Sequence, residues 1–444
     1  MDDPSLSNLP QELLHHIIHY LDSPPPSQSR LHDEPSSNLD ITWDEDAPLK
    51  ALSLVNKRFR KSILPLLCKH AALIVKPAEH RDDSYQESLD TFLPFVEEHG
   101  LSDKIQTFTL CVQEWDSCCQ NDPGRSGDHL TDVVCGFWER LLSCIDPRSI
   151  TVVASPCTLG YLTDCDIYPD DAWLFDIKYH ILHLSYNSTI TSQTTTTQSA
   201  LRKVSSGLPS PEGSVAGDHE SSSSTTLTSA PTIPSSNLFH IRPWTHIHLN
   251  EGSFIKAFHT YEYYHKRPPS LLPSLLGLLG PTHTPATPLF PSTATSFAYI
   301  AVFPIQSHFQ LITLGLPSLN SIFIQITPNN ANPWAENRVE MQRLDVNDLW
   351  MERNHCYSMV MRELFTEPPT GNWGQLREFQ SGDAADVDAW QLAVGFVERV
   401  GGWRVERPGV FVKNEKKGKG KGLAGVDDGE EGEDDGEQDS FNAL

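Results

Sequence analysis

Helical and strand-like windows alternate along much of this chain. Residues 85–96 carry apolar side chains at helical spacing, and residues 108–112 then alternate in the manner of a strand. The order repeats where a helical stripe over 130–145 is followed by the strand-like window 150–153. Because alternating helices and strands pack as layers around a sheet, this order predicts an α/β body.

The same alternation continues towards the C-terminus. We expect further strands at 180–184, 245–249, 297–303, 321–326, 375–379 and 403–412, and helices over 345–365 and 384–400. Three windows share one apolar spacing: Ile105/Phe108/Leu110, Trp244/Ile247/Leu249 and Leu319/Ile322/Ile324. This spacing resembles the strand half of a leucine-rich repeat, which implies a solenoid. A non-repeating α/β sheet explains the windows almost as well, because the repeat length is irregular.

Three segments have compositions that resist folding. Residues 22–47 combine a proline run with many acidic side chains, and residues 187–237 consist largely of serine and threonine. Residues 413–444 pass from lysine and glycine to an acidic block. We therefore expect a loop, a disordered insertion and a disordered tail. They divide the chain into an N-terminal unit (1–75), a recognition domain (76–412) and the tail.

Charge and cysteine content limit the kinds of partner and the cellular location that we expect. The formal net charge of −25 argues against nucleic acid and anionic membranes, because like charges repel. The most apolar stretch, 271–279, is too short to cross a membrane. The chain begins with acidic residues instead of a secretory signal, and its nine cysteines form no CxxC motif. We expect an intracellular protein with reduced thiols, in the cytoplasm and/or the nucleus.

Residues 9–21 have the features of an amphipathic helix. Pro10 suits the first helical position, and Glu12 places negative charge near the helix N-terminus, where it is favourable. Apolar side chains then follow at Leu13, Leu14, Ile17, Ile18 and Leu21. This apolar face is too wide for a short helix to leave in water, so the helix must pack against another surface.

A second helical region opens at Pro48. An apolar stripe runs through Leu52, Val55, Phe59 and Ile63, and the basic residues of 57–61 lie on the other faces. A unit of this size is near the lower limit at which a lone hydrophobic core is sufficient. We therefore expect a partner surface to complete it.

These two regions together resemble an F-box. The matching residues are Leu9-Pro10-x-Glu12-Leu13-Leu14-x-x-Ile17-x-x-Tyr20-Leu21 and Leu52-Ser53-Leu54-Val55-Asn56-Lys57-Arg58-Phe59. The resemblance implies that the helices bind the Skp-type adaptor of a cullin-RING ubiquitin ligase. Carried over by position, the adaptor contacts fall on Leu9, Pro10, Leu13, Leu14 and Ile17, with Leu52, Val55 and Phe59 shared between the core and the interface.

The chain departs from the F-box pattern at three places. The family usually has Cys where this chain has Asn56, and Trp where it has Phe59. It also usually joins its helices by a few residues, whereas here the insertion 22–47 intervenes. A long loop adds only about 0.6 kcal/mol of closure free energy per doubling of its length, so the two helices can still pair.

A second resemblance lies further along the chain. It rests on Phe239-x-Ile241-Arg242-Pro243-Trp244-Thr245, Asn250-Glu251-Gly252-Ser253-Phe254 and Tyr261-Glu262-Tyr263. These stretches are similar to ones in fungal F-box proteins with a leucine-rich-repeat-like C-terminal region. The resemblances imply an α+β multi-domain chain: a small helical F-box followed by an α/β leucine-rich-repeat-like solenoid with disordered insertions. They imply a substrate-recognition subunit of an SCF-type ubiquitin ligase with an unknown protein substrate.

We expect no catalytic residue, cofactor or metal. The chain contains no P-loop, G-x-S-x-G or H-E-x-x-H motif. His240, His246 and His248, with Cys111 or Asp164 as distant companions, do not supply three convergent zinc ligands by their spacing. The vicinal pair Cys118-Cys119 is expected to be two free thiols in a loop.

Three other interpretations stay open. The chain could be an F-box scaffold that acts outside ubiquitination. It could be an α/β enzyme with an unrecognised active site, which a deep pocket with several titratable groups of shifted pKa would mark. The N-terminal motif could also be two ordinary amphipathic helices inside a larger domain.

Overall fold

The computed structural model describes the chain in segments. These are residues 9–37, 39–42, 47–76, 84–113, 127–165, 167, 171–175, 177–186, 237–278, 287–328, 342–365 and 371–414, with backbone alone at 84–85, 127–135 and 371. The disorder predicted for 187–237 and 413–444 falls, apart from Asn237, Lys413 and Asn414, outside the described residues.

The described strands form one sheet of ten strands in the order β1-β2-β3-β4-β5-β6-β7-β8-β10-β9. Their bounds are β1 His70–Val75, β2 Thr107–Val112, β3 Ser149–Ala154, β4 His180–Ser185, β5 His246–Ser253, β6 Ser296–Val302, β7 Ser321–Gln325, β8 Glu378–Ser381, β9 Trp403–Arg407 and β10 Val410–Lys413. Strands β1 to β3 run parallel, as do β5 to β8. β4 is antiparallel to both of its neighbours, and an antiparallel hairpin, β9 and β10, closes the far edge.

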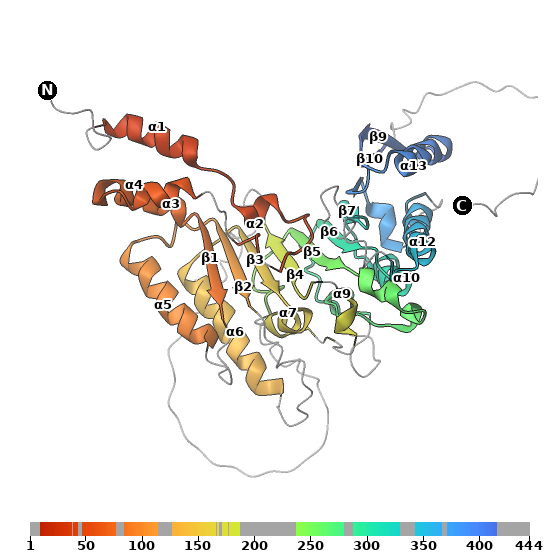
Figure 1. Ribbon diagram of the computed structural model, residues 1–444, viewed down its shortest axis with the longest axis horizontal. Coiled ribbons are helices and arrows are strands. Elements are labelled where there is room, and N and C mark those ends of the chain that lie inside the picture. The colour runs from red at the N-terminus through yellow and green to blue at the C-terminus, as the bar shows by residue number, and fades with distance from the viewer. Residues whose placement is uncertain are drawn as a thin grey trace, which may run out of the picture.

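Helices connect most of the strands. Their bounds are α1 Gln11–Leu21, α2 Pro26–Ser29, α3 Pro48–Ser53, α4 Lys57–Leu67, α5 Ser84–Glu98, α6 Gly127–Cys144, α7 Pro156–Thr163, α9 Leu272–Leu276, α10 Gln306–Gly315, α12 Val346–Phe365 and α13 Val387–Val400. Short 3-10 helices are η3 Ala172–Leu174, η4 Ile255–His259, η5 Tyr263–His265 and η7 Gly371–Gln375. Figure 1 shows α5, α6 and α7 on one side of the sheet and α2 on the other.

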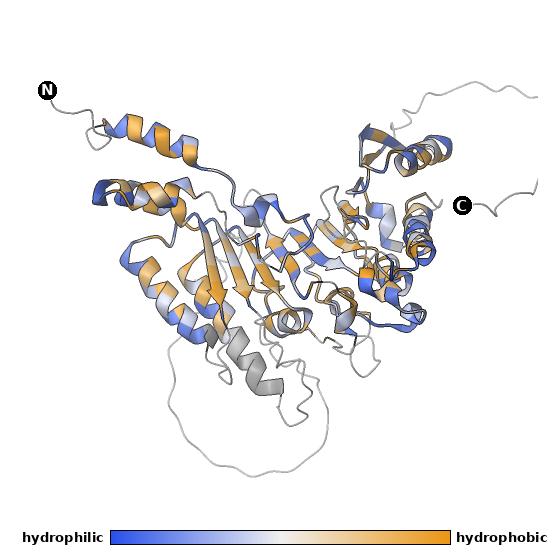
Figure 2. Cartoon of the chain, in the orientation of Figure 1, coloured by the Kyte–Doolittle hydropathy of each residue, from blue (hydrophilic) through white to orange (hydrophobic). Residues whose placement is uncertain are grey.

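The side chains of the strands explain why the helices cover one face. Alternate positions such as Phe108, Ile150 and Leu184 are fully buried in the main core, which extends through the helices. Because successive strand side chains point to opposite faces, the intervening positions form the other face. That second face carries Thr109, Thr151 and the imidazole of His183 and, further along the same strands, the apolar Cys111, Val153 and Ile181. In Figure 2 the apolar colour is strong along strands β1 to β3.

The insertion 22–47 lies on this second face. We expected it to resist compaction, yet residues 26–42, of which only Asn38 is outside the described residues, pack against the sheet. We call residues 26–42 the strap. Leu39 and Ile41 are buried with Cys111, Val153 and Ile181 in a small separate core, which Leu31 borders. A few apolar side chains therefore anchor a segment whose overall composition is polar.

The expected architecture of a separate helical F-box followed by a leucine-rich-repeat solenoid is wrong. The structure is an α/β arrangement built on one continuous, mostly parallel sheet. The antiparallel β4 and the terminal hairpin interrupt any repeat of parallel strands. The N-terminal helices are also joined to the sheet, because β1 follows α4 directly and pairs with β2, and Leu64 and Cys68 pack against the main core.

Several predicted elements differ in detail. The window 403–412 is two strands, because Gly409 turns the chain with φ +82°, where a Cβ would lie 2.8 Å from the Ser381 carbonyl oxygen. The strand predicted at 375–379 begins later, at Glu378, because η7 occupies the preceding residues. β1 was not predicted. Its Ile74 is 44% exposed at the sheet edge, which weakens the pattern of burial.

Candidate functional site

The N-terminal helices enclose a small core of their own. Leu14 and Ile18 of α1 pack with Leu49 of α3 and with Phe59 and Ile63 of α4. None of these side chains is more than 8% exposed. One apolar stripe of α1 is thus used to hold α1 against α3 and α4.

Polar contacts fix the start of α1 against α4. Arg58 donates hydrogen bonds to the Leu9 carbonyl at 2.8 Å and to the Gln11 side-chain oxygen at 3.1 Å. The Gln11 Nε2 donates to Ser62 Oγ at 3.1 Å. These bonds fix α1 against α4, although the insertion separates the two helices in the sequence.

A second apolar stripe of α1 faces solvent. Leu13 is 50% exposed, Ile17 37% and Tyr20 91%, while Leu54 and Val55, between α3 and α4, are 70% and 60% exposed. We call these five residues the outer apolar set. The apolar turns of α1 are visible in Figure 2. Leu13, Ile17 and Tyr20 follow one another at helical spacing along α1, and exposed apolar side chains of this kind are typical of protein-interaction surfaces.

The structure divides the eight sequence-predicted contact residues into three groups by exposure. Pro10, Leu13, Ile17 and Val55 are exposed, and Leu9 and Leu52 are partly buried. Leu14 and Phe59 are buried in the helical core and cannot contact a partner without rearrangement. The prediction did not include Tyr20 and Leu54 as contacts, although both belong to the matched motif. Tyr20 stands three residues after Ile17 on the same helix, and Leu54 directly precedes Val55; these neighbours were the available signal.

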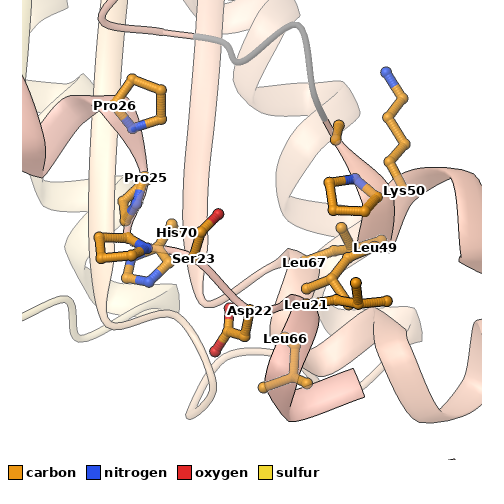
Figure 3. Close-up of a pocket in the computed structure, with 13 residues that line it drawn as sticks. Leu21, Asp22, Ser23, Pro25, Pro26, Leu49, Lys50, Leu66, Leu67 and His70 are labelled. Carbon is orange, nitrogen blue, oxygen red and sulfur yellow. The ribbon is translucent and has the colours of Figure 1, made fainter. Parts of the chain in front are cut away.

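A pocket of about 180 Å³ lies where the insertion leaves and re-enters the helical unit (Figure 3). It is lined by residues 21–26, by residues 47–50, by Leu66 and Leu67 of α4 and by His70 of β1. The Lys69 Nζ lies 3.6 Å from the Asp22 carboxylate beside it. The pocket is smaller than the roughly 300–1,000 Å³ of typical small-molecule sites. We interpret it as a gap in the packing where the two ends of the insertion meet the helices, and not as a ligand site.

A buried polar cluster surrounds Glu251 on β5. Its carboxylate accepts hydrogen bonds from Tyr299 Oη at 2.5 Å, from His308 Nε2 at 2.9 Å and from the Ser270 hydroxyl. None of these four residues is more than 5% exposed. Each carboxylate oxygen has at least one donor, which offsets the cost of burying the charge. The cluster therefore joins β5, β6 and α10 from inside the core.

Titratable groups of this cluster have shifted pKa values. Burial alone raises the pKa of Glu251, but the charge and hydrogen bond of His308, together with the His180 charge and the Ser270 hydrogen bond, lower that pKa on balance. Burial and the Glu251 charge raise the pKa of Tyr299 well above its ordinary value. Burial lowers the pKa of the neighbouring His180 to about 4. Structural ion-pair networks shift pKa values in this way as catalytic sites do, and these groups are closed to solvent.

The sequence candidates for a metal site do not converge. His246 is hydrogen-bonded to Ser296 at 3.1 Å, and His248 donates to the Leu31 carbonyl at 2.9 Å. His240 is exposed in the preceding turn, Cys111 is buried on β2 and Asp164 is exposed at the end of α7. Within the described residues, no group of three or more His, Cys, Asp or Glu side chains is arranged to hold a metal ion. The pair Cys118-Cys119 lies outside those residues.

Comparison of the chain with protein-family models, with curated proteins and with solved structures found no match. In the described part of the chain, none of the helices combines the length and the apolar character needed to cross a membrane.

Proposed function

We propose that this chain is the substrate-recruiting subunit of an SCF-type cullin-RING ubiquitin ligase. Helices α1, α3 and α4 bind the Skp-type adaptor, as the F-box-like residues imply, and the α/β body holds a protein substrate. The protein acts inside the cell, where the ligase operates. The observation that carries the proposal is the outer apolar set, which lies within the motif and is exposed although a neighbouring stripe already forms a core.

Energetics favour a protein partner for these helices. Leu13 and Ile17 stand on a well-formed turn of α1, and each is substantially exposed. Fully burying a side chain of this size contributes about 1.5–3 kcal/mol, so an adaptor that covers the outer apolar set gains several kcal/mol. The side chains are presented by helices that Arg58 and Gln11 already hold together, so little ordering is needed on binding.

In this proposal the chain contributes proximity and no covalent chemistry. Holding a substrate beside the ubiquitin-loading machinery raises its effective concentration there. The buried Glu251 cluster has a structural role, because its groups are saturated with hydrogen bonds and closed to solvent. This assignment disfavours the alternative of an α/β enzyme, for which shifted pKa values would have to face an accessible pocket.

The test is co-purification with a Skp-type adaptor. Wild type is expected to bind, and a Leu13→Asp, Ile17→Asp double variant is expected to lose binding, because burying uncompensated carboxylates costs several kcal/mol. The matched control is His15→Asp, His19→Asp, which adds the same charges to exposed positions on the opposite side of α1. Circular dichroism and thermal unfolding establish that each variant is folded.

The outcomes separate the proposal from its rivals. Failure of the folded wild type to bind the adaptor contradicts the ligase role. Equal loss in both double variants shows that added charge, and not the outer apolar set, weakens binding. Adaptor binding without cullin-dependent ubiquitin transfer to a co-purified protein marks a scaffold that acts outside ubiquitination.

A further inference from the structure

The two edges of the sheet differ in the side chains that they carry. β9, at one end of the strand order, has the exposed charges of Arg404, Glu406 and Arg407, and its register with β10 is irregular. Charges and irregular pairing at an edge strand hinder its pairing with another chain. β1, at the other end, contains no Asp, Glu, Lys, Arg or Pro. The β1 edge therefore lacks the features that keep the β9 edge from pairing.

The backbone of β1 presents hydrogen-bonding groups on its outer side. The Val75 carbonyl accepts a hydrogen bond from the Gln113 N–H, so the backbone groups of residue 75 face the β2 side. Because these groups point alternately to the two sides of a strand, the N–H and C=O groups of Ala72 and Ile74 face outwards. Ala72 is exposed and Ile74 is 44% exposed. No other strand in the described part of the chain pairs with this side of β1.

A pocket of about 200 Å³ opens beside the same edge. Its apolar walls come from the end of α4, from β1 and from α5, and they include Leu67, Ala71, Phe92, Phe95 and Val96. Two of these side chains, Phe92 and Phe95, are only partly buried. The pocket is too small for a typical small-molecule ligand. It has the size and the apolar character to take one large side chain.

The edge and the pocket together supply the two parts of recognition by strand addition. In this mode, main-chain hydrogen bonds to an exposed sheet edge give affinity, and pockets for alternate side chains give specificity. The outward backbone groups of Ala72 and Ile74 provide the first part. A side chain that lies next to Ala71 on the helix-covered face would enter the pocket, which provides the second part.

The charges around this edge favour a neutral or basic segment. His70 at the pocket is hydrogen-bonded to Thr107 at 2.9 Å, and burial lowers its pKa, so its ring is uncharged at neutral pH. Lys69 lies 3.6 Å from the Asp22 carboxylate, and Lys76 lies beyond the opposite end of β1. None of the residues that line the pocket is Asp, Glu, Lys or Arg. At longer range the net charge of −25 attracts a basic segment and repels a second copy of the chain.

We propose that the β1 edge and its pocket dock an extended segment of a substrate protein, which pairs with β1 as a further strand of the sheet. The segment is free of Pro where it pairs, places one large apolar side chain in the pocket and has neutral or basic flanks. This inference rests on the proposed function and deepens it, because it names where the substrate is held. β1 directly follows α4, so the substrate would lie beside the adaptor-binding helices (Figure 1).

The experiment uses a displayed library of random short peptides as the probe and the full chain as the target. The most enriched peptide is labelled with a fluorophore and titrated with wild type and variants. Ala72→Pro should weaken binding at least about tenfold, because it removes an outward N–H and costs no bond between β1 and β2. Ala72→Val keeps that N–H and should bind like wild type. Ala71→Leu should also weaken binding about tenfold, because its added side chain occupies the pocket.

Amide hydrogen exchange gives a direct readout of strand addition. The bound peptide should slow exchange of the Ala72 and Ile74 amides, which face outwards. The amides of Ala71 and Leu73 already face β2 and should change little. This alternation distinguishes pairing along the edge from a contact made by side chains alone.

Several results overturn the inference. They are failure to enrich any peptide, binding that Ala72→Pro and Ala71→Leu leave unchanged, or unchanged exchange at Ala72 and Ile74. If Ala72→Pro does not fold, Ala71→Leu and the exchange measurement decide. A wild-type dimer that Ala71→Leu or Ala72→Pro converts to a monomer would assign the edge to a second copy instead. Displacement of the peptide by the Skp-type adaptor would assign the edge to the adaptor interface.

The peptide measurement needs no adaptor, so its failure is distinguishable from failure of the proposed function. The Leu13→Asp, Ile17→Asp variant, which is expected to lose the adaptor, should bind the peptide as tightly as wild type. Loss of peptide binding in that folded variant would place the peptide on the outer apolar set and overturn the assignment to the β1 edge.

Discussion

Asn56 Oδ1 accepts a hydrogen bond from the backbone N–H of Phe59 at 2.8 Å, which makes Asn56 the N-terminal cap of α4. The cap ends the preceding turn and begins α4 so that Phe59 is fully buried in the helical core. At the position where F-box proteins usually have cysteine, the asparagine thus supplies a specific bond that a cysteine does not. The departure from the motif has a structural reason.

This cap predicts a measurable loss on substitution. Asn56→Ala should lower the free energy of unfolding of the helical unit by about 1 kcal/mol, because a backbone N–H of α4 loses its acceptor. Asn56→Ser, which also caps helices well, should lose much less. Hydrogen exchange of the α4 amides under native conditions measures both. Equal effects of Ala and Ser would show that the cap bond does not stabilise α4.

Two adjacent leucines of α1 should behave in opposite ways. Leu14 is 1% exposed, so Leu14→Ala should destabilise the helical unit by about 2–5 kcal/mol through the cavity it leaves. Leu13 is 50% exposed, so Leu13→Ala should change stability by less than about 1 kcal/mol and weaken adaptor binding. Thermal unfolding and adaptor titration of both variants test this. A large stability loss in Leu13→Ala would contradict the division into two stripes.

Leu13 and Leu14 also show which features of α1 could be predicted from the sequence and which could not. Helical spacing identified every apolar position of α1, but it could not decide which of two adjacent stripes faces α3 and α4. That choice depends on where α4 lies, and α4 is separated from α1 by the insertion. For this reason the buried Leu14 was predicted as a contact beside Leu13, and Phe59, which is fully buried, was predicted to be shared between the core and the interface.

The strap and the Glu251 cluster were beyond sequence reasoning for a different reason. Leu31, Leu39 and Ile41 have no helical or strand periodicity, and their partners lie on strands far along the chain. Glu251 lies two residues beyond the predicted strand 245–249, so the strand pattern did not place it inside the core. Its donors, Ser270, Tyr299 and His308, come from three other elements, which only the fold brings together.

Tyr299 provides a test of the buried cluster. Tyr299→Phe removes the hydroxyl that donates to Glu251 Oε2 at 2.5 Å and leaves the ring in place. A hydrogen bond to a charged group contributes about 1.5–3 kcal/mol, so stability should fall by about that amount. Phe297→Leu, a nearby change in the same strand without a hydrogen bond, controls for packing. Urea unfolding measures both, and an unchanged Tyr299→Phe variant would show that the hydrogen bond from Tyr299 to Glu251 does not stabilise the fold.

His180 predicts acid sensitivity of the fold. It is fully buried, both of its ring nitrogens are without a hydrogen-bond partner among the described residues, and burial lowers its pKa from 6.5 to about 4. Between these two values the unfolded chain binds a proton that the folded chain does not. Stability therefore falls as the pH drops through this window, by up to about 1 kcal/mol per pH unit, and is unaffected above it.

Replacement of this histidine isolates its contribution. His180→Leu should leave stability at pH 7.5 unchanged or slightly raised, because an apolar side chain replaces a polar ring that lacks hydrogen bonds. Between pH 6.5 and 4 the variant should lose less stability than wild type, since the unfolded chain no longer takes up that proton. His15→Leu, at an exposed position on α1, is the control and should follow wild type. Parallel pH profiles of His180→Leu and wild type in urea unfolding would show that His180 is not the group that makes the fold acid-sensitive.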